Sequence, residues 1–354
     1  MKLLAVLLVF APAAIAAHFL HANPVLVFAL SALAIVPLSG YLGKATEEIA
    51  SHTGPTLGGL LNATLGNLAE LIIAVLALRA GLVDLVKASI TGSILGNLLL
   101  VLGAAQLAGG LRHKVQRFSV ALAGLSISLL VVAVIGLVIP AMFLSTHPDP
   151  SHGLTRKVSV GVSVLLIVGY ALSLVYSMGT HRSVFGEGGD VANESHAAEH
   201  TPRWSLGRSV TLLLGSAAAI GWLSEILVGS TEAAIRGIGL SEVFVGIIVV
   251  PIIGNAAEHS SAVLMATRNR MDLAVSIAVG SSAQVALLIA PVLVFVGLAL
   301  GKPMDLAFST FEVVSVALAV AVATSVVRDA ESNWLEGAFL LLVYGMLGVA
   351  FYYF

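Results

Sequence analysis

The sequence has no cysteine and few charged residues, and each shortage excludes a class of function. With no cysteine among 354 residues, the chain has no disulfide, no thiolate metal ligand and no thiol nucleophile. Only 10% of the residues are charged and 58% are hydrophobic, so a soluble protein of this length could not cover its surface with polar groups. The net charge of −2 provides no basic surface for nucleic acid. We therefore expect an all-α polytopic membrane protein.

Long apolar runs predict eleven transmembrane helices, since each span needs about 20 apolar residues. The expected segments are 3–20, 24–42, 58–79, 82–108, 118–145, 156–178, 207–235, 241–266, 272–299, 305–327 and 334–354. The first run, MKLLAVLLVFAPAAIAA, also matches a signal peptide with a cleavage motif at Ala14–Ala16. We favour a retained first helix in residues 1–22, and the signal-like interpretation stays open.

Lys and Arg are unevenly divided between the two predicted faces of the membrane. The N-terminus and the loops after helices 2, 4, 6, 8 and 10 contain eleven of the seventeen, which predicts that this face is cytoplasmic. The polar segment 179–204 then becomes a cytoplasmic acidic linker. It separates a first half, 23–178 with helices 2–6, from a second half, 205–354 with helices 7–11.

An internal repeat relates the two halves. A shift of 188 residues aligns 58–100 with 246–288 without a gap, and fourteen of the 43 positions are identical. Shared hydrophobicity does not explain polar matches such as Asn67 with Asn255 and Glu70 with Glu258. The repeat motifs occupy 58–108 and 246–299, and their helices are predicted to enter the membrane from opposite faces. Inverted repeats are typical of secondary transporters, whose sites form where broken helices meet near the midplane.

Each repeat places a glutamate deep in a predicted span. Glu70 is twelve residues into its helix, about 18 Å at 1.5 Å per residue, and Glu258 is similarly deep. An ionised acid at the bilayer centre costs about 2.5–3.5 kcal/mol. Two facing acids cost more unless a cation lies between them or protons neutralise them. The pair therefore predicts a site that holds either a divalent cation or protons.

Oxygen ligands without cysteine favour a hard cation such as Ca²⁺, which takes about 6–8 oxygens. Two glutamates cannot supply so many, so neutral groups from both repeats are expected to help. Side-chain and freed backbone oxygens are predicted at Asn67, Asn255, Gly66, Gly254, Ser93, Ser281, Gln284 and Asn97. No resident cofactor is expected, because Ca²⁺ and H⁺ are cargo.

The motifs GNLAELIIA and GSILGNLLLVLG in the first half, with GNAAEHSSAV and GSSAQVALLIAP in the second, resemble the Ca²⁺/H⁺ exchangers (CAX) of the Ca²⁺/cation antiporter superfamily. The resemblance covers nearly the whole chain. It implies ten helices in two inverted five-helix halves plus one more, and alternating access. It also implies that Glu70 and Glu258 carry both Ca²⁺ and H⁺, with His259 as the histidine beside the second glutamate.

Several other polar residues have two interpretations each. His259 is either a proton relay or a core residue that holds Glu258. Glu47 and Glu232 are either ion-entry residues or solvated helix ends, and a functional role is favoured for Glu225. The linker acids either sense Ca²⁺ or belong to an inert linker, and they are Glu187, Asp190, Glu194 and Glu199. Asp84 and Asp272 are expected to cap helix N-termini.

These features predict a secondary active antiporter that exchanges cytosolic Ca²⁺ for H⁺, and not an enzyme. An exchanger coupled to Na⁺ or another cation is the alternative, and a passive cation channel is a weaker one. We expect a prokaryotic plasma membrane, with a vacuolar membrane as the alternative. Homo-oligomer formation and regulatory Ca²⁺ are left open.

Overall fold

The computed structural model describes residues 2–53, 55–147, 149, 153–181 and 203–354, which form two compact units. The first unit contains residues 1–89, 196–258 and 351–354, and the second contains 90–195 and 259–350. Helix α6 (Val83–Leu95) divides between the units after Ser89, and α15 (Ala256–Thr267) divides after Glu258. The predicted linker acids Glu187, Asp190, Glu194 and Glu199 lie outside the described residues.

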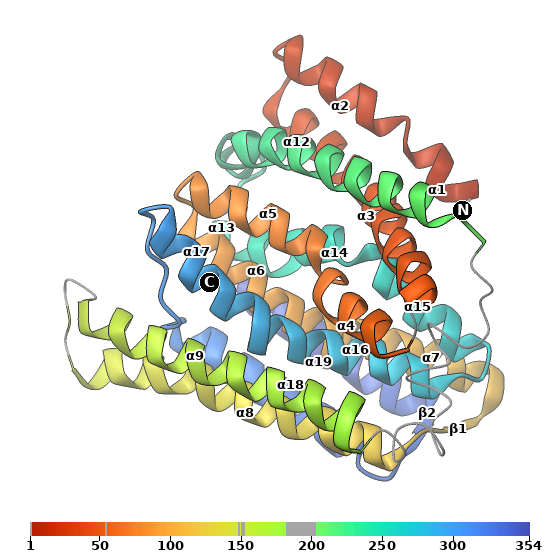
Figure 1. Ribbon diagram of the computed structural model, residues 1–354. Coiled ribbons are helices and arrows are strands. Elements are labelled where there is room, and N and C mark those ends of the chain that lie inside the picture. Colours follow the sequence, from red (N-terminus) through yellow and green to blue (C-terminus); the bar gives the residue numbers. More distant parts are fainter. Residues whose placement is uncertain (1, 54, 148, 150–152, 182–202) are drawn as a thin grey trace. The chain divides into compact units, whose positions relative to one another are not determined.

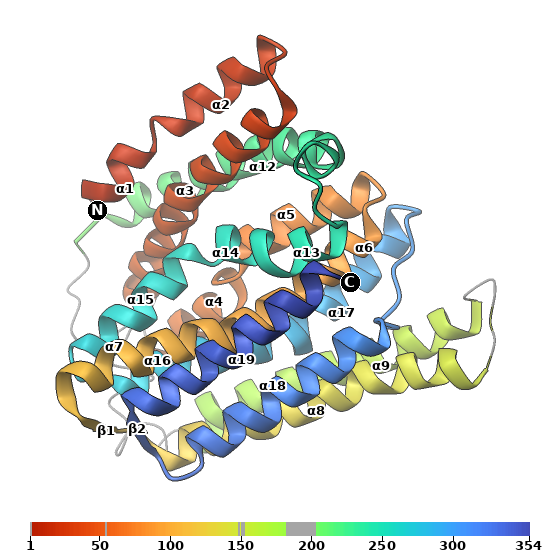
Figure 2. The same ribbon diagram turned by 180° about the vertical axis from the view of Figure 1, so that it is seen from behind.

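The first unit is built around two long helices, α3 (Pro24–Thr53) and α12 (Leu206–Ile238), which lie side by side (Figures 1 and 2). Helix α5 packs on α12, while α4 and α14 pack on α3. Its shorter elements are α1 (Lys2–Leu7), α2 (Phe10–Phe19), α4 (Pro55–Leu65), α5 (Leu68–Arg79), α13 (Glu242–Phe244), η4 (Val245–Val249) and α14 (Val250–Gly254). Buried Leu42, Ala69 and Ile220 join α3, α5 and α12 in one apolar core.

The second unit packs α8 against α9, α16 and α18 (Figure 2). Its two short strands pair antiparallel, Val115 with Asn333. Close approach of α7 and α19 depends on small residues, because a Cβ on Gly337 would lie 2.3 Å from the backbone nitrogen of Leu107. Its elements are η1 (Gly96–Val101), α7 (Leu102–His113), β1 (Val115–Arg117), α8 (Val120–Thr146), α9 (Gly153–Val175), η2 (Tyr176–Thr180), α16 (Met271–Gln284), η5 (Val285–Ile289), α17 (Ala290–Ala299), α18 (Thr310–Val327), β2 (Glu331–Asn333) and α19 (Trp334–Tyr352).

The polytopic all-α prediction is confirmed. Among the described residues, nine helices are long and apolar enough to cross a membrane, and the bent pair Glu242–Gly254 and Ala256–Thr267 makes a tenth if it is one span. The predicted first segment forms only short helices, of which Ala5–Phe19 is apolar. The count of eleven spans therefore stays a prediction. The predicted end at residue 42 is wrong, because α3 continues through polar residues to Thr53.

The backbone carries the same irregularities at positions 188 residues apart. Asn67 separates α4 from α5 with φ −94° and ψ 22°, and Asn255 separates α14 from α15 with φ −101° and ψ 7°. The π-helices η1 and η5 begin at nearly equivalent positions, Gly96 and Val285, which are 189 residues apart. The second break is sharply bent, by 64°, whereas Leu57–Arg79 passes as one span. Pro251 stands where the first repeat has Ala63, and a proline inside a helix promotes such a kink.

The aspartates that were expected as helix caps take other positions. Asp272 lies inside the first turn of α16, whose N-cap is Arg270, and its Oδ1 accepts a hydrogen bond of 2.6 Å from the backbone N–H of Ser119. Asp84 also lies inside a first turn, one residue after α6 begins. The N-cap prediction is therefore wrong. The Asp272 carboxylate therefore accepts from Ser119, the residue before α8, and not from the N-terminal backbone of its own helix.

Candidate ion-binding site

The two predicted carboxylates occupy equivalent places just after the helix breaks. Glu70 lies in the first turn of α5 and Glu258 in the first turn of α15, each three residues after the asparagine at the break. Both belong to the first unit. A helix N-terminus has a partial positive charge, which stabilises a nearby carboxylate by about 0.3–1 kcal/mol. Both breaks therefore place a carboxylate in the first turn of the helix that follows, where the exposed N–H groups favour negative charge.

Each glutamate lies against the glycine of the other repeat. A Cβ on Gly254 would lie 3.2 Å from the Cγ of Glu70, and a Cβ on Gly66 would lie 3.9 Å from the Oε1 of Glu258. The two glycines thus leave space that the opposite glutamates occupy. The structure therefore brings Glu70, Glu258, Gly66 and Gly254 together, although they come from segments 188 residues apart.

Both break asparagines are buried, and the second of them belongs to the same group. Asn67 and Asn255 are 3% and 2% exposed. The side-chain Nδ2 of Asn255 donates a hydrogen bond to the Oε1 of Glu70, a contact from the second repeat to the first. A hydrogen bond to a charged acceptor is stronger than one between neutral groups. This contact fixes one oxygen of Glu70 within the cluster.

The remaining predicted donors belong to the second unit. Ser93 lies on α6, Asn97 in η1, and Ser281 and Gln284 on α16. Helix α16 packs against η1. Within the described residues, the buried Nδ2 of Asn97 has no hydrogen-bond partner.

His259 also belongs to the second unit. Its buried Nε2 has no hydrogen-bond partner within the described part of the chain. This nitrogen therefore does not hold the Glu258 carboxylate by a hydrogen bond.

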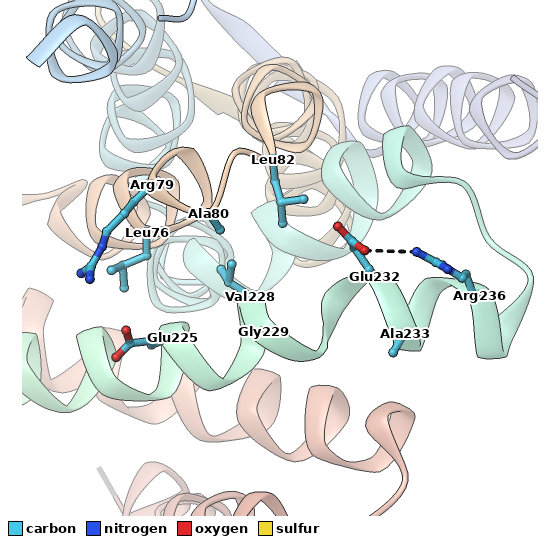
Figure 3. A pocket seen from close by; sticks show the side chains of 10 residues that line it. All are labelled: Leu76, Arg79, Ala80, Leu82, Glu225, Val228, Gly229, Glu232, Ala233 and Arg236. Atoms are coloured by element: carbon cyan, nitrogen blue, oxygen red, sulfur yellow. Dashed lines mark hydrogen bonds and ion pairs between the residues drawn. The ribbon is translucent and has the colours of Figure 1, made fainter. Parts of the chain in front are cut away.

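A pocket of about 850 Å³ contains two of the three described acids that were expected along an access path. Glu225 and Glu232 lie on its α12 wall, and Arg79 of α5 lies on the opposite wall (Figure 3). The third, Glu47, is elsewhere: its side chain is 38% exposed and lies 3.9 Å from the Nζ of Lys44.

Sequence reasoning missed Glu48, the neighbour of Glu47. Glu48 is only 3% exposed, and its Oε2 accepts hydrogen bonds from the backbone N–H groups of Arg203 (2.9 Å) and Trp204 (3.2 Å). Lys44 lies 3.6 Å from its Oε1, and His52 Nε2 is 2.8 Å from the Trp204 carbonyl oxygen. The spacing of Lys44, Glu48 and His52, four residues apart on one helical face, is the signal that could have identified this group.

These residues, with Arg208, form what we term the Trp204 cluster. The Trp204 ring faces two cations, Lys44 Nζ at 5.8 Å and Arg208 at 5.1 Å from its centroid. The cluster attaches the end of the segment before α12 to α3. It extends α3 beyond its apolar run, because Glu48 and His52 have partners there.

A cation at the glutamate pair would need neutral ligands. Among the described residues, no three His, Cys, Asp or Glu side chains gather closely enough to hold a metal ion. Two carboxylates offer at most four oxygens, whereas Ca²⁺ takes about 6–8.

The fold and this carboxylate pair define a polytopic helical membrane protein with two broken helices around one polar centre. Two stretches of the chain, 23–179 and 208–353, match the family model described as sodium/calcium exchanger protein. The chain belongs to this family.

Individual relatives are similar over almost their full lengths. A Ca²⁺/H⁺ antiporter of Synechocystis sp. is 46% identical, covering 99% of this chain and 97% of that protein. The Ca²⁺/H⁺ antiporter ChaA of Bacillus subtilis is 40% identical over 96% of both chains. A crystal structure of the selenium-substituted Ca²⁺/H⁺ antiporter protein YfkE superimposes with a TM-score of 0.85 at 35% identity and covers 100% of both chains.

Proposed function

We propose that this protein is a Ca²⁺/H⁺ antiporter, in which Glu70 and Glu258 bind either Ca²⁺ or protons. The relatives described above are Ca²⁺/H⁺ antiporters by name, and transporters of this kind are not enzymes. The observation that carries the assignment of residues is the reciprocal contact of each glutamate with the other repeat's glycine. One ion or two protons can then satisfy both acids at once.

Ca²⁺ and protons exclude each other from the glutamate pair, and this exclusion couples the transport of one to the transport of the other. Two ionised carboxylates in a poorly solvated centre repel each other, so the empty site is costly to move across the membrane. A divalent cation neutralises both charges, and two protons do the same. The carrier therefore changes sides only when it is loaded with one cargo or the other, and export of Ca²⁺ is driven by the inward movement of H⁺.

The ligand set extends beyond the acids. Asn67 and Asn255 contribute amide oxygens, and the breaks after Gly66 and Gly254 free backbone carbonyls. Ser93, Ser281 and Gln284 stay sequence-based predictions as further donors, with Asn97 beside them. His259 stays a sequence-based prediction as a proton relay next to Glu258.

Alternating access follows from the repeat. Five spans separate the start of Leu57–Arg79 from that of Glu242–Thr267. If each span crosses once, the two broken helices run in opposite directions, as inverted repeats require.

We propose the cytoplasm for the N-terminus and a prokaryotic plasma membrane, or a vacuolar one, for the protein. No resident cofactor is proposed.

Na⁺ coupling is the second candidate, because the family description names sodium. Proteoliposomes distinguish the two couplings. Collapsing the proton gradient while imposing a Na⁺ gradient should stop Ca²⁺ uptake by a proton-coupled exchanger and sustain it in a sodium-coupled one.

The assignment of the carriers is tested by Glu70→Gln. Radioactive Ca²⁺ uptake into inverted vesicles, driven by a pH gradient, should be lost in this variant and kept in Glu47→Gln, which changes an exposed acid. Wild-type uptake by Glu70→Gln would overturn the proposed mechanism.

A further inference from the structure

One face of α12 lines the pocket shown in Figure 3. Its wall residues recur every three or four positions, which places them on a single helical stripe. They are Glu225, Val228, Gly229, Glu232, Ala233 and Arg236. The stripe is about 16 Å long at 1.5 Å per residue, and Glu225 forms its inner end.

The exposed face of α12 changes in character along the helix. Between residues 212 and 224 its exposed large side chains are apolar, as expected for contact with lipid: Leu214 and Trp222. From Glu225 onward the exposed side chains include acids and arginine. Glu225 is thirteen residues before the helix end at Ile238, about 20 Å along the axis. A charged side chain at such depth is expected to face water and not lipid, and the pocket provides that space.

The charges in the pocket are not equivalent. Glu232 Oε2 and Arg236 Nη2 form an ion pair at 3.1 Å, so these two charges balance each other. Glu225 and Arg79 extend from opposite walls, α12 and α5 (Figure 3). Neither makes an ion pair with another residue in the part of the chain that the structure describes. We call Arg79 a tethered cation, because its positive charge is attached to the chain and lies in the same pocket as the Glu225 carboxylate.

The pocket lies at the C-terminal end of α5, the helix that contains Glu70. Arg79 is nine residues after Glu70 on α5, about 13 Å along the axis, and Leu76 of the same helix lines the pocket. A cation that leaves Glu70 along α5 would therefore meet Glu225 and Arg79 next.

We propose that this pocket is the aqueous route between the glutamate pair and the side of the membrane on which α12 ends. Glu225 is its innermost carboxylate and binds a divalent cation transiently. Arg79 competes with the cation for Glu225 and so lowers the affinity on this side, which favours release over return. The inference rests on the proposed exchange of Ca²⁺, but the existence of the route is tested independently of transport.

Water access is measured with single cysteines, for which the natural chain is a ready background because it has none. Gly229→Cys keeps Glu225, and a Cβ at this position meets nothing within 4 Å. Leu240→Cys, just beyond α12, identifies the side on which the helix ends. A membrane-impermeant, charged thiol reagent should modify Gly229→Cys and Glu225→Cys from that same side. The apolar control Leu214→Cys should stay unmodified.

The role of the two charges is measured by Ca²⁺ transport with the ion supplied on the Leu240 side. Arg79→Gln should lower KM for Ca²⁺ severalfold on this side and leave KM on the other side unchanged. Glu225→Gln should raise the same KM severalfold. Lys302→Gln removes a cation on the same predicted face but outside the pocket, and its KM should equal that of the wild type.

The outcomes separate this inference from the proposed function. If Gly229→Cys and Glu225→Cys resist the reagent while the wild type exchanges Ca²⁺ for H⁺, the route is wrong and the function stands. If both cysteines react but Arg79→Gln behaves like Lys302→Gln, the tethered-cation role is wrong. If the wild type moves no Ca²⁺, the proposed function fails, and labelling alone still decides whether the pocket is aqueous.

Discussion

The side-chain amide of Asn255 donates a hydrogen bond to the Oε1 of Glu70, 185 residues earlier in the chain. This bond joins the asparagine of one repeat to the glutamate of the other. The glycine contacts follow the same rule, since Gly254 faces Glu70 and Gly66 faces Glu258. Each carboxylate is therefore positioned by its own helix break and surrounded by the opposite one, so neither repeat could form the site alone.

Asn255→Ala should raise KM for Ca²⁺ in proteoliposomes by about tenfold or more, since a hydrogen bond to a charged group contributes about 1.5–3 kcal/mol. The variant loses both the bond that orients Glu70 and one amide oxygen. Asn23→Ala is the control, because the Asn23 side chain accepts a hydrogen bond from the backbone N–H of Val25 at the start of α3, outside the glutamate site. An unchanged KM in Asn255→Ala would show that the Asn255 amide does not contribute to Ca²⁺ binding.

Three glycine-to-alanine variants should separate transport from stability. In Gly254→Ala the new methyl lies 3.2 Å from the Glu70 side chain, which can shift, so we expect slower transport with nearly normal thermal stability. In Gly58→Ala it lies 2.4 Å from the carbonyl oxygen of Ala50 in α3, which is backbone, so the melting temperature should fall. Gly43→Ala meets nothing within 4 Å and should change neither property. A stable, fully active Gly254→Ala would contradict the close contact with Glu70.

The carboxylate cluster could be predicted from sequence because the motif that marks it contains polar residues and occurs twice in the chain. Glycine and asparagine before an acid indicate a helix break, and the second copy gives the partner. Nothing comparable marks Glu48. The sequence analysis named Glu47, one residue away, as a possible ion-entry residue, but only the folded chain shows which of the two acids is turned toward Arg203 and Trp204. Hydropathy also ended α3 too early, since its last turns are stabilised by polar contacts and not by apolar burial.

Glu48→Gln should destabilise the protein, whereas Glu47→Gln should not. Glu48 accepts two backbone hydrogen bonds while it is buried, so the loss of its charge weakens both bonds and the contact with Lys44. We expect a loss of about 1–3 kcal/mol in the free energy of unfolding. Thermal unfolding followed by tryptophan fluorescence measures it, because Trp204 lies in the cluster. Equal melting temperatures for the two variants would show that the Trp204 cluster contributes no stability.

Competition between Ca²⁺ and protons predicts a pH-dependent stabilisation by Ca²⁺. A ligand that binds only the folded protein stabilises it by RT ln(1 + [L]/Kd), about 2.7 kcal/mol at a hundredfold excess over Kd. Because Ca²⁺ needs both glutamates ionised, protons bound at low pH must leave first, and Kd rises as pH falls. At a fixed Ca²⁺ concentration, the increase in melting temperature should therefore be larger at high pH than at low pH.

Substitution of the glutamates distinguishes this competition from a general effect of pH on stability. In Glu70→Gln or Glu258→Gln only one acid can ionise, so the stabilisation by Ca²⁺ should nearly vanish at every pH. Glu47→Gln should keep both the stabilisation and its pH dependence. If Ca²⁺ stabilised the wild type equally at low and high pH, the cation and the protons would not share a site. The two carboxylates could then bind Ca²⁺, but they could not by themselves couple its movement to that of protons.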